Sequence, residues 1–356
     1  MNKIICEQSR KRNEFLNFLK FILIMIVAFH HTGWWSGVMR HGYIAVEFFF
    51  MVSGYFLYQT FINKGPKLKE YLLSRIERIY PTYILILVIY MLFSIGFPQF
   101  FSTYNWKGWI ITAFRDLFLL QSVGLNYFDD ISPRFNPNDW YISSFFWSSM
   151  LLYYLLRFKR LTKVFLTVVI LSTYSFYFLF KISSLNEYWG YYYLFYMPFW
   201  RAIAGMSIGI LIGMFLKNEK NKKTLQCNIK YFNMCAIISI VVICFCIITP
   251  KDYDCLCCIS FVCLIMNVLT HNGIGHVFVN NKYIKHLPDF SFEILLLHQI
   301  LIPFSVKFMS IIGIVDINFL KYISYAAITI FISYLFNREI TLKIRLLIQN
   351  IKNISF

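Results

Sequence analysis

Ten apolar runs, each about long enough to cross a lipid bilayer, constrain this chain more than any other feature of its sequence. They cover residues 15–34, 43–62, 80–97, 140–157, 163–181, 193–216, 231–249, 253–270, 290–311 and 318–336. A helix of about 20 residues spans the hydrocarbon core of a bilayer. Because 58% of the 356 residues are hydrophobic and 14% are charged, an ordinary soluble domain is excluded. The sequence therefore predicts an all-α fold, a polytopic transmembrane helical bundle of about ten spans forming one domain over 1–356.

The distribution of lysine and arginine predicts how these runs cross the membrane. The net charge is +17, and basic residues gather at the N-terminus, in the 63–79 loop, the 157–163 turn, the 217–230 segment and the tail from Arg338. Positively charged loops stay on the cytoplasmic side. Both termini are therefore predicted to be cytoplasmic, in a multi-pass protein of the inner (cytoplasmic) membrane. No nucleic-acid partner is needed to explain the charge.

A further apolar stretch, 107–123, is ambiguous because it contains Arg115 and Asp116. The basic 157–163 turn faces the cytoplasm only if this stretch does not cross the membrane. We therefore expect a re-entrant or interfacial segment at 107–123. The long segment 98–139 then becomes an outer cap, and a connection of that length is more often functional than a passive linker.

The first run holds two ionisable residues, Lys20 and His31, at positions where charge is costly and therefore functional by default. Eleven residues make about three helical turns, so both side chains lie on one stripe, roughly 16 Å apart. Glu47 begins the second run at a depth similar to that of His31. A carboxylate bonded to one imidazole nitrogen raises the basicity of the other. We expect His31 and Glu47 to form such a pair, with His31 as general base; the alternative is a purely structural hydrogen bond between helices.

Two further groups flank the membrane. Arg75 and Arg78 share a helix face ahead of the third span, and arginine forks suit phosphate. They could equally anchor the helix at the cytoplasmic interface. Because Lys20 approaches from the same side, we expect Lys20, Arg75 and Arg78 to bind a phosphate-bearing ligand there. Asp139, Trp140 and Ser143 open the fourth predicted run. Its aromatic residues suit either an interfacial belt or a platform on which a sugar stacks, and the sequence favours neither.

Buried polar residues also occur in later spans. Arg201 precedes glycines at a spacing of four, which predicts close helix packing around a charge that needs an anionic partner or a water-filled cavity. His298 lies about one and a half helical turns after Glu293. Like His31, it is either a functional residue or one that only forms a structural hydrogen bond between helices. The cysteines at 255, 257, 258 and 263 lie in an apolar run, so we expect buried thiols and no metal site.

Six motifs in this order resemble the membrane acyltransferase family 3, which includes bacterial O-acetyltransferases of surface polysaccharides, and the resemblance covers essentially the whole chain. They are Lys20-x10-His31, Glu47-Phe-Phe-Phe-Met-Val-Ser53-Gly54, Arg75-x-x-Arg78-x-Tyr80-Pro81, Asp139-Trp140-Tyr141-x-Ser143, Arg201-x3-Gly205-x3-Gly209 and Ser291-x-Glu293-x4-His298. Each motif alone is weak, and their shared order is specific. Glu47 stands where the family more often has aspartate.

The resemblance implies transfer of an acyl group, usually acetyl, from acyl-CoA to a hydroxyl of a cell-surface glycan or its lipid-linked precursor. It implies that His31 is the essential histidine and that Arg75 and Arg78 meet the CoA donor. Acyl-CoA would be a co-substrate, with no permanently bound cofactor. The expected partners are a carbohydrate acceptor, membrane lipid and glycan-assembly proteins. The competing classes are a secondary transporter or polysaccharide exporter, and a non-catalytic membrane partner of a glycan-assembly complex.

Overall fold

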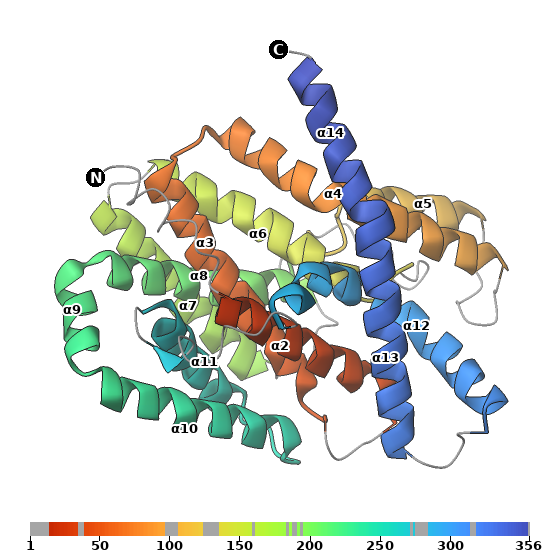
Figure 1. Cartoon of the computed structure of the whole chain (residues 1–356). Helices are drawn as coiled ribbons and strands as arrows, with labels where there is room; N and C mark the ends of the chain where they lie inside the picture. Colours follow the sequence, from red (N-terminus) through yellow and green to blue (C-terminus); the bar gives the residue numbers. More distant parts are fainter. Residues whose placement is uncertain are drawn as a thin grey trace.

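The predicted helical bundle is confirmed by the structure, a computed structural model (Figure 1). It describes residues 14–34, 39–96, 106–123, 135–158, 161–182, 185–186, 191–192, 195–270, 273–274, 284–313 and 318–354. In chain order the elements are α2 (Glu14–Thr32), η1 (Gly42–Ile44), α3 (Ala45–Asn63), α4 (Leu68–Gly96), α5 (Trp106–Leu117), α6 (Asp139–Phe158), α7 (Leu161–Ile182), β1 (Tyr191–Tyr192), β2 (Phe195–Tyr196), α8 (Met197–Lys217), α9 (Glu219–Cys227), α10 (Ile229–Ile248), α11 (Asp254–Leu269), η4 (Ile284–Phe290), α12 (Ser291–Ile311), α13 (Asn318–Phe336), η5 (Asn337–Thr341) and α14 (Leu342–Ile354).

Within the described ranges, eight helical segments are long and apolar enough to cross a membrane. They correspond to α2, α3, α4, α7, α8, α10, α12 and α13, and so match eight of the ten predicted runs. The other two runs are also helical. However, α6 is rich in serine and tyrosine, and α11 has 16 residues, about 24 Å of helix. The helical membrane bundle is thus confirmed, with two of its predicted spans less apolar or shorter than the rest.

The stretch 107–123 does not form a spanning helix. Its helix, α5, has 12 residues and rises about 18 Å, well short of the roughly 30 Å of a hydrocarbon core. Arg115 and Asp116 form a buried ion pair with each other, Nε to Oδ1, at 3.1 Å. After α5 the chain turns at Leu119, whose φ is 54° and whose carbonyl accepts a hydrogen bond from Ser143. This arrangement fits the expected re-entrant or interfacial segment. Residues 97–105 and 124–134, which include most of the expected outer cap, lie outside the described part of the chain.

The predicted 63–79 loop is wrong in extent, because α4 already begins at Leu68. The helix continues through Pro81 into the third span. Lysine, arginine and glutamate have good helix propensity, so a basic stretch before an apolar run can extend the helix instead of ending it. Arg75 and Arg78 therefore lie on a helix that is continuous with the third membrane span.

The glycines of α8 let it pack directly against α3. A Cβ atom at Gly209 would overlap the carbonyl of Met51, and one at Gly54 would overlap the carbonyl of Met206. Side chains larger than hydrogen are therefore excluded from this contact on both helices. The predicted role of the glycines is confirmed, and the contact sets the position of Arg201 relative to α3.

The bundle has two ends, which we name after residues of α2. The His31 end is where α2 finishes and α3 begins, and the Lys20 end is where α3 finishes and α4 begins. α13, η5 and α14 continue one another as a long helix whose last part extends beyond the neighbouring helices (Figure 1).

Candidate active site

His31 contacts a second histidine instead of the expected carboxylate. Its Nδ1 lies 2.9 Å from Nε2 of His298, and the two rings stack with centroids 5.1 Å apart. Nδ1 of His298 in turn lies 3.0 Å from the carbonyl oxygen of Ile294. These three groups form what we call the histidine relay, which joins α2 to α12 across 267 positions of sequence.

The relay assigns the protons on both rings. A carbonyl oxygen can only accept, so Nδ1 of His298 carries the hydrogen and its Nε2 presents a lone pair. The amide nitrogen of Asn138 lies 3.1 Å from that Nε2, which is consistent with an acceptor there. Nδ1 of His31 must then donate to His298. In the neutral relay, Nε2 of His31 is therefore the unprotonated nitrogen, as a general base requires.

The part of α12 around His298 is held by tyrosines from two other helices. The Tyr90 hydroxyl donates to the Leu296 carbonyl at 3.2 Å and accepts from the Ile300 amide at 3.1 Å. In a regular helix those two backbone groups would bond to each other, so the hydroxyl is inserted into the helix. The Tyr325 hydroxyl donates to the His298 carbonyl at 2.9 Å. These bonds fix the backbone that carries the second histidine.

The expected pair of His31 and Glu47 is wrong. The Glu47 carboxylate accepts from Nε of Arg201 at 2.8 Å, and both side chains are buried, with exposed fractions of 0% and 1%. Arg201 also donates to the carbonyls of Leu185, at 2.7 Å, and Tyr43, at 3.4 Å. Glu47 and His31 were expected to pair because of their similar depth. Close packing of α3 on α8 instead turns the Glu47 side chain toward Arg201. The predicted anionic partner of Arg201 is thus Glu47.

The side chains at the start of α6, the fourth predicted run, are buried. Asp139 is fully buried and accepts from the Tyr83 hydroxyl at 3.2 Å. Trp140 is buried, and the Arg201 guanidinium lies over its ring at 5.3 Å. The structure therefore gives no support to a sugar platform formed by these two residues. Their neighbour Asn138 reaches the relay, although a helix-opening asparagine carries no signal in a single sequence that would have revealed this.

Ser143 and Glu293 serve local structure. Ser143 accepts from the Ser122 amide at 3.0 Å and donates to Leu119, which ties the turn after α5 to α6. Glu293 is buried and accepts from the side chain of Asn337 at 2.9 Å. That contact links the start of α12 to η5, so neither residue lies in the relay.

At the Lys20 end the two arginines differ. Arg75 is half-buried, with its guanidinium 4.8 Å from the ring of Tyr71 and 5.5 Å from that of Phe145. Among the described residues, its guanidinium has neither an ion pair nor a hydrogen bond. Arg78 is exposed, and the ammonium of Lys20 lies 5.1 Å from the ring of Phe56. Arg75 is therefore a preformed cation whose N–H groups remain available to an anion.

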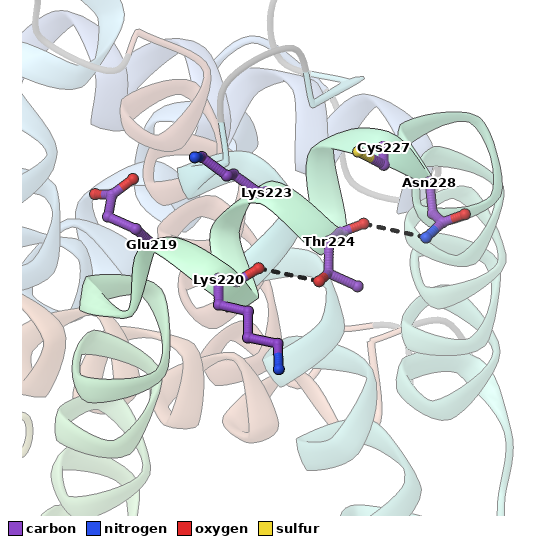
Figure 2. A pocket seen from close by; sticks show the side chains of 6 residues that line it. All are labelled: Glu219, Lys220, Lys223, Thr224, Cys227 and Asn228. Atoms are coloured by element: carbon purple, nitrogen blue, oxygen red, sulfur yellow. Dashed lines mark hydrogen bonds between the residues drawn. The ribbon is translucent and has the colours of Figure 1, made fainter.

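A cavity of about 520 Å³ lies elsewhere, against α9. It is lined by Glu219, Lys220, Lys223, Thr224, Cys227 and Asn228, which Figure 2 shows spread along α9 and its C-terminal end. Thr224 and Asn228 bond to carbonyls one turn earlier within this segment. None of the predicted site residues lines this cavity, and it is separate from the relay.

The model of the acyltransferase 3 family, described as an acyltransferase domain, matches residues 13–338 of this chain. The match begins just before α2 and ends in η5, so it includes the relay, the Glu47–Arg201 pair and Arg75. No curated protein and no solved structure matches the chain.

Proposed function

Because the chain belongs to the acyltransferase 3 family of membrane acyltransferases, we propose that it transfers an acetyl group from acetyl-CoA to a hydroxyl of a cell-surface glycan or its lipid-linked precursor. The proposed location is the inner membrane, with both termini in the cytoplasm. The single observation that carries the proposal is the histidine relay, which leaves Nε2 of His31 as a proton acceptor at the end of a span.

The relay suits the proton transfers of this reaction. Nε2 of His31 takes the proton of the acceptor hydroxyl as its oxygen attacks the thioester carbonyl. The carbon–sulfur bond breaks, and the CoA thiolate leaves and takes that proton from the imidazolium. During the step, the lone pair on Nε2 of His298 stabilises the positive His31 ring through the 2.9 Å contact. Positioned bases of this kind contribute about 10²–10⁴ in rate.

The Lys20 end supplies the charge that an anionic donor needs. The Arg75 guanidinium is held against two aromatic rings and has no ion-pair or hydrogen-bond partner among the described residues, so its N–H groups would bind a phosphate of CoA. Lys20 lies on the same helix as His31, roughly 16 Å away along its axis. A donor whose phosphates stay at the basic end could extend its thioester arm along α2 to the relay.

The proposal is tested with the full chain purified in detergent, supplied with radiolabelled acetyl-CoA and the glycan fraction of cells that lack the protein. Label in glycan with release of free CoA is the expected result, and mass spectrometry should find one added acetyl group. The His31→Ala variant is the matched negative control. Transfer by this variant at the wild-type rate, or no transfer by the wild type with any glycan fraction, would overturn the assignment.

A further inference from the structure

A cluster of polar side chains at the His31 end lies outside the relay. His41 precedes η1, Tyr43 lies in it, Asp252 lies between α10 and α11, and Asp254 begins α11. Nδ1 of His41 is 3.0 Å from a carboxylate oxygen of Asp252 and 3.1 Å from the Tyr43 hydroxyl. That hydroxyl donates to Asp254 at 3.0 Å. The cluster thus joins three segments that are distant in sequence.

The cluster carries more negative charge than the protein neutralises. Asp254 is buried, and the donors to its carboxylate among the described residues are both neutral: the Tyr43 hydroxyl and the Leu185 amide, each at 3.0 Å. In the part of the chain that the structure describes, neither aspartate forms an ion pair with a lysine or arginine. Arg201 is already paired with Glu47. Two carboxylates so close together, one of them away from water, repel each other strongly unless a cation joins them.

Protonation of His41 is a poor substitute for that cation. The ring is buried, and its Nε2 has no hydrogen-bond partner among the residues the structure describes. A charged imidazolium would therefore hold an N–H group with no acceptor, which is costly in a buried position. Coordination of a divalent ion through Nδ1 leaves that same N–H on the ring, but it brings two positive charges to the two carboxylates instead of one.

We propose that His41, Asp252 and Asp254 bind a divalent first-row metal cation. One ligand atom from each residue lies within 4.8 Å of the other two, and ligand atoms around such an ion are roughly 3.0–3.6 Å apart. The three can therefore converge through small side-chain movements. An imidazole with two carboxylates suits manganese or zinc better than calcium, which takes oxygen ligands.

The ion would bind at an edge of the bundle. The Asp252 side chain is 57% exposed, so the ion has access from solvent and open positions for water. The Leu185 amide already orients the Asp254 carboxylate, as outer hydrogen bonds do in metal sites. The bound ion would fix the start of α3 to α11. This role does not depend on acyl transfer.

Mn²⁺ is the probe of choice, because it binds thiols weakly and this chain has nine cysteines. The full chain, purified in detergent and treated with EDTA, is titrated with Mn²⁺ and free ion is followed by electron paramagnetic resonance. We expect one saturable equivalent and a raised melting temperature. Asp252→Asn, a change at an exposed side chain, should lower the affinity at least tenfold and abolish the temperature shift.

Asp289→Asn is the matched control, since Asp289 lies 3.5 Å from His286 and this pair belongs to no three-residue metal-ligand group among the described residues. It should bind Mn²⁺ as the wild type does. The melting temperatures of all three proteins in EDTA establish that each is folded. Absence of saturable Mn²⁺ binding to the wild type, or equal affinity of wild type and Asp252→Asn, would overturn the proposal.

Discussion

The histidine relay and the Glu47–Arg201 pair both connect distant helices through buried polar groups, but they differ in charge. The relay joins two imidazole rings and a backbone carbonyl, which carry no net charge when both rings are neutral. The Glu47–Arg201 contact is an ion pair with exposed fractions of 0% and 1%. Breaking such a pair leaves an uncompensated buried charge, which is strongly unfavourable. From this comparison we expect the relay to act in proton transfer and the ion pair to hold α3 on α8.

The largest effect should follow from removing the base. His31→Ala should lower the rate of acyl transfer by about 10²–10⁴ while the melting temperature stays near that of the wild type. His30→Ala is the matched control, because His30 bonds to the Met39 carbonyl and not to His298. Equal losses in both variants would mean that the adjacent histidines act on structure alone.

Breaking the Glu47–Arg201 ion pair should lower stability more than activity, the opposite of what we expect for His31→Ala. Arg201→Met should lower the free energy of unfolding by about 3–5 kcal/mol, because it strands the Glu47 carboxylate in a buried position. The melting temperature in detergent measures this loss, and activity per folded molecule should fall less. Adding Glu47→Gln to Arg201→Met should recover part of the lost stability. A double variant no more stable than the single one would show that the charge of Glu47 is not the cause.

The second histidine should matter less than the first. His298→Ala removes the acceptor that orients His31 and should lower kcat by about tenfold to a hundredfold, since the base remains but is no longer held in one tautomer. His298→Gln can still offer an oxygen to Nδ1 of His31, so it should retain more activity than the alanine variant. The profile of kcat against pH should also change in His298→Ala. An unchanged profile with reduced protein yield would indicate a packing role only.

The smallest effect concerns the donor. Arg75→Lys keeps the charge but loses the planar group that stacks on Tyr71 and Phe145. We expect KM for acetyl-CoA to rise about tenfold, from the loss of one charge-assisted hydrogen bond of about 1.5 kcal/mol, with kcat nearly unchanged. Arg78→Lys changes an exposed side chain and should raise KM less. Equal KM values in both variants and the wild type would leave Arg75 as a topological anchor.

The sequence by itself determined the features that depend on local pattern. Run length and hydropathy predicted the helices, the charge of the loops predicted that 107–123 would not cross, and glycine spacing predicted the close contact of α8. The stripe from Lys20 to His31 also follows from helix geometry alone. What the sequence missed locally was the start of α4 at Leu68, because a basic stretch can continue a helix as readily as end one.

Only the tertiary structure decided which buried polar groups meet. Glu47 and His31 are near each other in sequence and depth, yet Glu47 pairs with Arg201, 154 positions away, and His31 pairs with His298, 267 positions away. Hydropathy gives the depth of a residue in the membrane but not the direction in which its helix face points. That direction depends on the approach of neighbouring helices, here on how closely Gly205 and Gly209 allow α8 to approach α3. The rotation of each helix about its axis therefore fixes which partner a buried side chain meets. The sequence of one segment does not specify that rotation.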